Sequence, residues 1–226
     1  MKYKSKLLMK EFVTHDVERF ILEKPKNYKF LSGQATKIYI DRGKWKKKGR
    51  PFTFTSLNED KVLEFTIKEY PKHKGVTQQL SKLKSGDKMI ITRPFGTIRY
   101  KGKGVFIAGG AGVTPFISIL RNLKKQNKIK GNKLIFSNKE AKDIILEKEF
   151  IDMFKASSKD LIFTLTREKN KNYYYGRIDK KFLKKHVKNF KQNFYVCGPP
   201  KFVGTISQTL EDLGAKVDSV IFEGKK

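Results

Sequence analysis

The segment from residue 105 to residue 123 constrains the fold of this chain more than any other. A β-rich stretch at 105–108 runs into the sequence GGAGVTP at 109–115, and residues 116–123 then show helical periodicity. Glycines let the backbone approach an anion closely, and the first turn of a helix presents free N–H groups and the positive end of its dipole. The segment therefore predicts a pyrophosphate site, and the alternative is a tight strand-to-helix turn without a ligand.

The second half of the chain alternates strands with amphipathic helices, which indicates a parallel sheet flanked by helices. The expected strands are residues 105–108, 133–137, 161–166, 194–197 and 217–222. The first half contains only short β-rich segments separated by Gly, Pro and Asn, which indicates an antiparallel β-barrel. Its expected strands are residues 12–23, 36–41, 52–56, 62–70 and 88–92.

The two patterns meet in a segment rich in Gly and Lys at residues 100–104. Glycine clusters of this kind mark connections between structural units. We therefore expect two domains, a β-barrel domain at 1–101 and an α/β domain at 102–226.

The composition allows a packed core but is strongly basic. The chain has 226 residues, of which 38% are hydrophobic, and its 51 basic and 22 acidic residues give a net charge of +29. Such a field attracts acidic proteins, nucleic acid or anionic membranes. The lysines are scattered along the chain, and the one dense run, at 44–48, resembles a loop. Their placement therefore does not favour nucleic-acid binding.

The cysteine and histidine content argues against a metal centre. Cys197 is the only cysteine, so the chain can form neither an internal disulfide nor a Cys-ligated iron–sulfur cluster. His15, His73 and His186 have no paired spacing, although folding could still gather ligands around one of them. We expect these histidines to be surface or packing residues and expect no metal.

Nothing in the sequence directs the chain to a membrane or out of the cell. The N-terminus lacks the apolar stretch of a secretory signal. The longest uncharged run, at 104–120, is too short for a membrane span and is broken by glycines and Pro115. We therefore expect a cytoplasmic protein without a membrane span.

A second turn rich in Gly and Pro follows another expected strand. Residues 194–196 lead into the sequence CGPP at 197–200 and then into a helix that reaches about residue 213. Ligands of open α/β sheets bind beside the carboxyl ends of the strands, so this turn and the one at 109–115 could bracket one dinucleotide. Taken alone, Cys197 is typical of a small buried core residue.

The sequence RPFT at residues 50–53 is the first chemical signal in the barrel half. The alternation of a strand places Arg50 and Phe52 on one side, where a cation and an aromatic ring could hold a phosphate and a flat ring. Thr53 adds a hydroxyl group for hydrogen bonding. Considered in isolation, the segment fits ordinary barrel packing with an exposed arginine.

A further helix start lies in the barrel half. Gly75, Val76 and Thr77 precede a short helical stretch at 78–83 and form a second possible anion site. The alternative is a plain capped helix.

The order of these elements resembles the ferredoxin-NADP reductase superfamily. The order is RPFT, GVTQQL, RPFG at 93–96, GGAGVTP and CGPP, and the resemblance covers nearly the whole chain. It is similar to compact bacterial members that have flavin and nicotinamide domains and no iron–sulfur domain. The resemblance implies an enzyme that passes hydride from NADPH or NADH to FAD, and electrons onward to an acceptor such as flavodoxin or ferredoxin.

For the flavin, the resemblance implies that Arg50 meets the phosphates, Phe52 flanks the isoalloxazine and Thr53 bonds near its N5 edge. It further assigns Ile67, Lys68, Gly75, Val76 and Thr77 to flavin binding, the last three at the pyrophosphate. Phe52 and Thr53 depart from the usual Tyr and Ser of the family. Loss of the tyrosine hydroxyl removes one hydrogen bond, worth about 0.5–1.5 kcal/mol, and keeps the stacking surface.

For the nicotinamide dinucleotide, the resemblance assigns two sets of residues. They are Gly110, Gly112, Thr114 and Pro115 along the dinucleotide, and Cys197, Gly198 and Pro199 beside the nicotinamide. Thr53 and Cys197 are the expected catalytic residues, which act by aligning two rings. Phe222 is the candidate for an aromatic residue that covers the flavin.

The loop after the second strand of the α/β domain is expected to recognise the 2′ position of the dinucleotide. Ser137, Asn138 and Lys139 include no carboxylate, which favours NADPH over NADH. Glu140 and Asp143 follow closely, and a turn could bring either back toward the ribose.

A competing hypothesis uses the charge alone: a basic module on the same fold that binds nucleic acid or an acidic protein without catalysis. For the enzyme, the same charge predicts an acidic electron carrier as partner. The sequence leaves the oligomeric state and the identity of the acceptor open.

Overall fold

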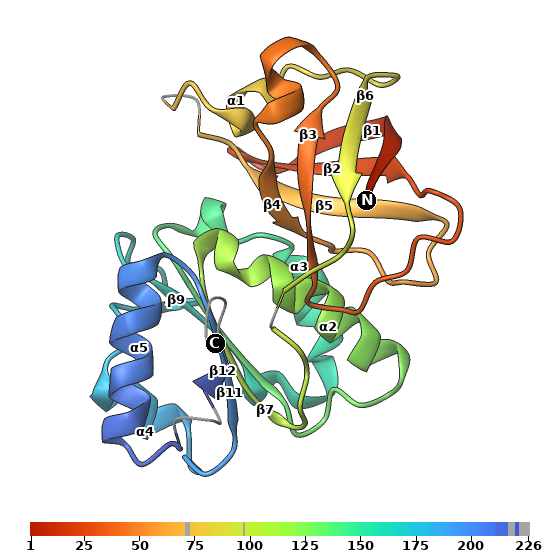
Figure 1. Ribbon diagram of the computed structural model, residues 1–226. Coiled ribbons are helices and arrows are strands. Elements are labelled where there is room, and N and C mark those ends of the chain that lie inside the picture. The colour runs from red at the N-terminus through yellow and green to blue at the C-terminus, as the bar shows by residue number, and fades with distance from the viewer. Residues whose placement is uncertain (71–72, 97, 217–219, 222–226) are drawn as a thin grey trace.

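Two six-stranded sheets follow one another along the chain in the computed structural model, which describes residues 1–70, 73–96, 98–216 and 220–221 (Figure 1). The first sheet is antiparallel, in the order β4-β3-β6-β1-β2-β5. Its strands are β1 (Lys2–Thr14), β2 (Val17–Glu23), β3 (Ala35–Ile40), β4 (Arg50–Thr53), β5 (Val62–Lys68) and β6 (Lys88–Thr92). The sheet curves until its edges meet, where the Thr55 N–H donates to the Glu64 carbonyl oxygen at 2.8 Å. The predicted antiparallel barrel is confirmed.

The alternation of strand β5 explains how the barrel is joined to the rest of the molecule. Leu63, Phe65 and Ile67 point into the barrel core and are almost fully buried. Glu64 and Thr66 point the other way, yet they are only 9% and 5% exposed. Polar residues on the outer face of a barrel strand are normally solvated, so their burial means that the second domain covers this face.

The predicted strand at 12–23 is wrong, because this stretch belongs to two strands. β1 and β2 pair as a hairpin that turns at His15 and Asp16. No glycine, proline or asparagine marks the turn, so the β-rich pattern seemed continuous. The start of β1 was missed because it is rich in lysine: Lys2, Lys4 and Lys6 are exposed and alternate with more buried residues such as Ser5 and Leu7.

Short helical segments complete the barrel half. They are α1 (Val76–Leu80) and the 3₁₀ turn η1 (Gly43–Lys47), which corresponds to the lysine-rich run expected to be a loop. α1 begins and ends earlier than the expected helix at 78–83.

The second sheet is parallel throughout and has the order β10-β9-β8-β7-β11-β12. Its strands are β7 (Gly104–Gly109), β8 (Lys133–Asn138), β9 (Leu161–Leu165), β10 (Tyr174–Tyr175), β11 (Asn193–Cys197) and β12 (Val220–Ile221). The two-residue strand β10 was not predicted, since a pair of exposed tyrosines has no burial pattern. The last expected strand, 217–222, falls partly outside the described residues.

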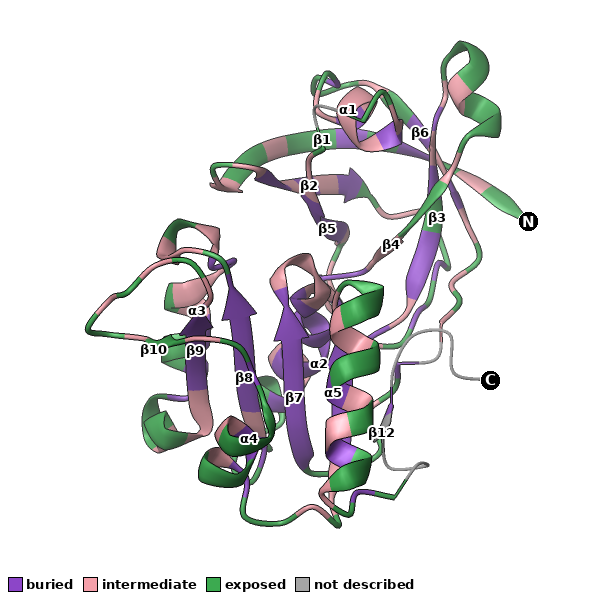
Figure 2. Ribbon diagram, turned by 90° about the vertical axis from the view of Figure 1, so that its left-hand side faces the viewer, coloured by how far each residue is buried: buried purple, intermediate pink, exposed green. Residues whose placement is uncertain are grey.

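Helices cover both faces of this sheet, as predicted (Figure 2). They are α2 (Thr114–Lys125), α3 (Glu147–Met153), α4 (Lys180–His186) and α5 (Pro200–Asp212), with 3₁₀ turns η2 (Gly110–Val113), η3 (Ala141–Asp143) and η4 (Lys155–Asp160). Phe106 and Ala108 of β7 pack on the side of α2 and α3, and Val105 and Ile107 pack on the side of α4 and α5. The predicted α/β fold of the second domain is confirmed.

Tyr195 of β11 holds the connection between the two sheets. Its ring stacks on Phe106, with 4.4 Å between centroids. Its hydroxyl accepts from the N–H of Lys101 at 2.8 Å and donates to the carbonyl of Gly102 at 2.7 Å. Burial raises the pKa of Tyr195 to about 12, so the phenol stays protonated. The expected boundary between residues 101 and 102 lies in this connection and stays a prediction.

The strand order reverses direction between β7 and β11. From β7 the chain proceeds through β8 and β9 to one edge of the sheet, and β11 and β12 lie on the other side. Open α/β sheets bind ligands at such a switch point, outside the carboxyl ends of the strands. In Figure 2 the arrows of β7, β8 and β9 point toward the barrel. The carboxyl ends therefore face the first domain.

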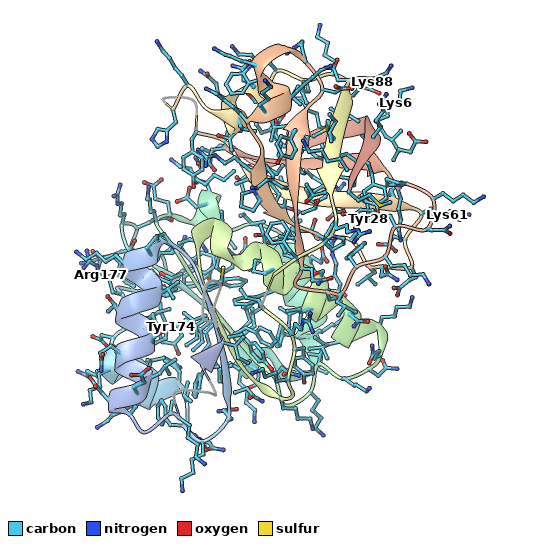
Figure 3. The ribbon with its side chains drawn as sticks, viewed as in Figure 1. Lys6, Tyr28, Lys61, Lys88, Tyr174 and Arg177 are labelled. Atoms are coloured by element: carbon cyan, nitrogen blue, oxygen red, sulfur yellow. The ribbon has the colours of Figure 1, made fainter. Side chains whose placement is uncertain are left out.

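Exposed basic side chains lie on both domains. Figure 3 shows Lys6, Lys61 and Lys88 on the barrel and Arg177 on the α/β domain, all of them exposed. No helix among the described residues is long and apolar enough to cross a membrane.

Candidate functional site

A cleft of about 760 Å³ lies between the barrel and the carboxyl edge of the parallel sheet. Strands β4 and β5 supply the barrel wall, and the turns after β7, β8 and β11 supply the sheet wall. The cleft is lined by fourteen of the residues expected from the sequence to contact cofactors: Phe52, Thr53, Ile67, Lys68, Thr77, Gly110, Gly112, Thr114, Pro115, Ser137, Asn138, Cys197, Gly198 and Pro199.

The two glycine turns of the sheet wall lie against each other. Gly110 has a φ of +52°, which favours glycine, and it begins the 3₁₀ turn before α2. A Cβ on Gly112 would lie 2.4 Å from the carbonyl oxygen of Cys197. Because no side chain fits there, the turn after β7 can rest directly on the turn after β11. Glycine at residue 112 is thus required by packing between the two turns.

Two helices begin at this wall. α2 starts with Thr114 and Pro115, and α5 starts with Pro200. Neither first turn receives a side-chain cap from the described residues, and the Thr114 hydroxyl donates to the Ala111 carbonyl at 3.0 Å. The Thr114 N–H already donates to the Ala111 carbonyl oxygen, and Pro115 and Pro200 have no N–H. The positive end of each helix dipole still makes the wall suited to a negatively charged group.

Asn138 gives the sheet wall a buried polar side chain without a partner among the described residues. The residue ends β8, lines the cleft and is 5% exposed. Its side-chain oxygen and nitrogen have no hydrogen-bond partner among the described residues. A buried amide without partners costs about 1–3 kcal/mol, so a residue of this kind fits a site whose ligand carries both donors and acceptors.

On the barrel wall, fewer of the residues expected to contact the flavin line the cleft. Phe52 and Thr53 are half-buried and line the cleft with Pro51, whereas Arg50 is exposed and is not among the lining residues. Thr77 lines the cleft, but the Val76 side chain is buried in the barrel core.

Gly75 is also absent from the lining, and α1 has only five residues. The expected cradle at 75–77 is therefore represented in the cleft by one threonine. Phe222 lies outside the described residues.

Several lining residues were not expected from the sequence. Among them are Thr66 in the barrel strand β5, Tyr70 after that strand, Ile145 after β8, Thr166 after β9, and Phe202 in α5. Thr166 could have been found, because it follows the carboxyl end of a strand just as Gly110 and Cys197 do. Thr66 could not, since nothing in the sequence shows that the outer face of β5 is covered.

Some of the polar and charged residues at the end of β8 and after it face the cleft, and others do not. Ser137, Lys139 and Asp143 line the cleft. Glu140 instead pairs with Lys142 at 2.7 Å, and this hydrogen bond lowers the pKa of the Glu140 carboxyl. Of these two carboxylates, Asp143 is the one that lines the cleft.

A cluster formed by Arg121, Glu64 and Glu149 fixes the two walls relative to each other. Arg121 of α2 binds Glu149 of α3 through two nitrogens, at 2.6 and 2.9 Å, and reaches across to Glu64 of β5 at 2.6 Å. It also donates to the carbonyl of Thr55 at 2.8 Å.

Burial alone would lower the pKa of Arg121, but the hydrogen bonds and charges of Glu149 and Glu64 raise it. The guanidinium therefore stays charged. A second contact between the domains, from the Gly33 N–H to the Ser118 hydroxyl oxygen at 3.0 Å, lies nearby.

Family models match both halves of the chain. The model described as "Oxidoreductase FAD-binding domain" matches residues 4–100, and the model described as "Oxidoreductase NAD-binding domain" matches residues 106–208.

Two fungal relatives are similar over most of the chain. NADH-cytochrome b5 reductase 2 of Mycosarcoma maydis is 30% identical over 214 residues, covering 85% of this chain and 60% of that protein. NADH-cytochrome b5 reductase 2-B of Vanderwaltozyma polyspora is 30% identical over 218 residues, covering 85% of this chain and 69% of that protein. The chain therefore spans less than two thirds of the length of the Mycosarcoma maydis relative.

Solved structures show the same fold. The FAD/NAD-binding domain of nitric oxide dioxygenase from Vibrio cholerae superposes with a TM-score of 0.87 at 20% identity and covers 97% of each chain. A ferredoxin NADP⁺ reductase from Neisseria gonorrhoeae, with FAD and NADP bound, superposes with a TM-score of 0.82 at 22% identity and covers 98% of each chain.

Proposed function

This chain belongs to the ferredoxin reductase-like superfamily of FAD- and NAD-binding oxidoreductases, and we propose that it passes hydride from NAD(P)H to FAD and single electrons to a separate carrier protein. The membership bears out the predicted family, the flavin-dependent enzyme class and the cofactors. The observation that carries the proposed reaction is the single cleft, which is lined both by the barrel strands and by the glycine turns of the sheet.

On the barrel wall, we assign Phe52, Thr53 and Lys68 to the flavin. The half-buried Phe52 offers a flat apolar surface, and the Thr53 hydroxyl offers a donor and an acceptor at the same wall. Arg50 begins the strand that carries both residues, and its exposed guanidinium suits phosphates at the outer end of the cofactor.

On the sheet wall, we assign Gly110, Gly112 and Thr114 to the dinucleotide pyrophosphate. The support is physical: the glycines keep the wall free of side chains, and α2 begins at this wall with the positive end of its dipole. Asn138 would satisfy its unpaired amide on the dinucleotide. Cys197 ends β11, Pro199 follows it, and both would border the nicotinamide.

The two residues assigned to catalysis, Thr53 and Cys197, stand on opposite walls of the cleft. Cys197 is 9% exposed at the end of β11, and Thr53 is half-buried at the end of β4. Neither acts as an acid or base in this proposal. Each side chain limits where one ring can lie, so the contribution of the protein is proximity and orientation.

For the nicotinamide cofactor, we propose a preference for NADPH. Ser137, Lys139 and Thr166 line one part of the cleft and offer two hydroxyls and a cation to a 2′-phosphate. Asp143 opposes this preference, but one of its oxygens, Oδ2, already accepts the N–H of Glu140 at 3.0 Å. The fungal relatives are named for NADH, which makes this the least supported part of the proposal.

For the acceptor, we propose an acidic one-electron carrier. The net charge of +29 speeds encounter with an acidic partner. The names of the relatives make cytochrome b5 the first carrier to test, and the flavodoxin and ferredoxin expected from the sequence come second.

Steady-state kinetics test the proposal. FAD-loaded protein is assayed with NADH and NADPH in turn, with ferricyanide as artificial acceptor and then with each carrier. We expect turnover with ferricyanide, a higher kcat/KM with NADPH, and carrier reduction that slows as salt rises. Absence of ferricyanide reduction with either nucleotide contradicts the enzyme assignment. A salt-independent rate contradicts only the acidic carrier.

A further inference from the structure

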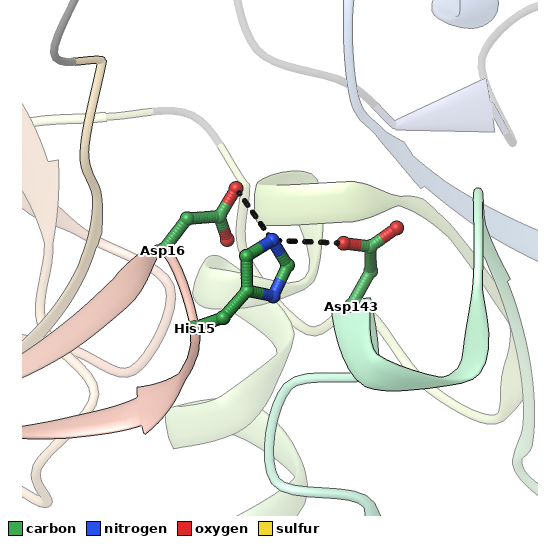
Figure 4. A group of neighbouring side chains, drawn as sticks. All are labelled: His15, Asp16 and Asp143. Carbon is green, nitrogen blue, oxygen red and sulfur yellow. Dashed lines mark ion pairs between the residues drawn. The ribbon is translucent and has the colours of Figure 1, made fainter.

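A mixed cluster of His15, Asp16 and Asp143 lies beside the cofactor cleft, and the proposed reaction gives no role to His15 or Asp16 (Figure 4). His15 and Asp16 form the turn between β1 and β2 of the barrel, and Asp143 belongs to η3 of the α/β domain. Within the described part of the chain it is the one group of three or more such side chains close enough to share a metal ion.

The distances approach those of a metal site. His15 Nε2 lies 3.6 Å from Asp16 Oδ2 and 3.7 Å from Asp143 Oδ1, and all three ligand atoms lie within 4.8 Å of one another. Tetrahedral zinc with bonds of about 2.0–2.2 Å holds its ligands roughly 3.3–3.6 Å apart. Small side-chain rotations are therefore enough to bring the three atoms around one ion.

Neighbouring contacts orient the two carboxylates. Asp143 Oδ2 accepts the N–H of Glu140 at 3.0 Å, so Oδ1 is the oxygen that faces His15. Asp16 Oδ2 pairs with Lys68 at 2.5 Å, while Oδ1 lies 3.3 Å from the Thr14 hydroxyl. Hydrogen bonds of this kind hold ligands in place around a metal.

The Lys68 ammonium pairs with the same Asp16 oxygen, Oδ2, that faces His15, so a bound cation has to displace the ammonium from that oxygen. The His15 side chain is 47% exposed, which leaves room for a water molecule as the fourth ligand. A histidine nitrogen with two carboxylate oxygens and a water is a ligand set that zinc accepts.

We propose that His15, Asp16 and Asp143 bind a zinc ion that bridges the two domains at the edge of the cofactor cleft. Asp143 lines the cleft and His15 belongs to the barrel, so the bound ion would tie one cleft wall to the other. Bridging would restrict the entry and exit of the dinucleotide. Zinc should therefore act as a reversible inhibitor.

Direct binding tests this site independently of the proposed reaction. FAD-loaded protein competes with a chromophoric zinc indicator for ZnCl₂, and we expect one zinc per chain. Loss of an outer-shell partner typically weakens a site about 10–100-fold, so His15→Ala and Asp143→Asn, which remove ligands, should each weaken zinc binding at least tenfold. Lys68→Met should strengthen it, since the competing ammonium is gone.

His73→Ala is the matched control, because His73 is another exposed barrel histidine and stacks on Tyr70 instead of facing a carboxylate. We expect it to bind zinc as the wild type does, and circular dichroism verifies that each variant is folded. Zinc inhibition of ferricyanide reduction should disappear in His15→Ala and be reversed by EDTA in the wild type. Equal zinc affinity in the wild type and His15→Ala, or no uptake by the wild type, overturns the proposal.

Discussion

The two walls of the cleft differ in how firmly the sequence determines them. Every residue assigned to the sheet wall in the described chain lines the cleft, whereas Arg50, Gly75 and Val76 of the barrel side do not. Strands of a parallel sheet end at one edge, so a residue just after a strand is placed by topology alone. Barrel strands end at different heights, and their outer residues can face solvent or the cleft.

The largest loss of stability is expected from a substitution in the cluster of Arg121, Glu64 and Glu149, which joins the two walls. Arg121→Met removes the cation that binds both Glu64 and Glu149 and, among the described residues, leaves Glu64 with only the Arg19 guanidinium as cation, 4.0 Å away. Breaking such a partly buried ion-pair network is expected to lower the free energy of unfolding by about 2–3 kcal/mol. Urea denaturation of the FAD-loaded protein measures this.

Lys125→Met is the control for the Arg121 substitution. Lys125 of the same helix pairs with Glu59 across the same domain boundary, but both side chains are exposed, at 58% and 47%. We expect a change within about 0.5 kcal/mol. Equal losses in the two variants would show that the Arg121 cluster does not hold the walls together.

The next largest loss of stability is expected from a substitution that disturbs the packing of the two glycine turns. Gly112→Ala places a Cβ 2.4 Å from the Cys197 carbonyl oxygen, so one turn has to move. We expect a loss of about 1–3 kcal/mol in stability and a raised KM for NAD(P)H with little change in FAD affinity.

Gly204→Ala serves as the control, since a Cβ there meets nothing within 4 Å and helix α5 gains from alanine by about 0.5–1 kcal/mol. If Gly112→Ala raises the FAD dissociation constant as much as it raises the KM for NAD(P)H, the sheet wall does not serve the dinucleotide alone.

Several features that position this site could not be read from the sequence. The Arg121–Glu64 pair joins residues 57 apart, and neither residue lies in a recognisable motif. Thr66 became a cleft residue only because the second domain covers the outer face of β5. By contrast, Gly112 and Cys197 each follow a buried strand, and the strand order brings the two turns together.

A substitution at Asn138, on the sheet wall, should have a smaller effect, and it should change stability and nucleotide binding in opposite directions. Asn138→Leu replaces an unpaired buried amide by an apolar group of similar size. We expect the FAD-free protein to gain about 1 kcal/mol in unfolding free energy while the KM for NAD(P)H rises. Thermal and urea unfolding measure the first, and ferricyanide assays the second. A loss of stability would mean that the Asn138 amide has a partner within the protein.

A substitution at Arg50 tests the barrel wall, which the sequence determines less firmly. We expect the smallest effect here, on the affinity for FAD. Because its guanidinium is exposed, a phosphate contact contributes on the order of 1 kcal/mol, about a fivefold change in affinity. Arg50→Ala should raise the FAD dissociation constant by that factor and leave hydride transfer per bound flavin unchanged. Titration of the flavin-free protein with FAD decides this, and an unchanged dissociation constant removes Arg50 from the site.

Anaerobic stopped-flow reduction of the FAD-loaded protein tests the central claim, that one cleft brings both cofactors together. Mixing with NADPH or NADH should bleach the flavin absorption in a single turnover. Cys197→Ala should bind FAD normally and be reduced more slowly, because its side chain limits the position of the nicotinamide. A protein that binds FAD and the dinucleotide, yet leaves the flavin oxidised, would contradict the account.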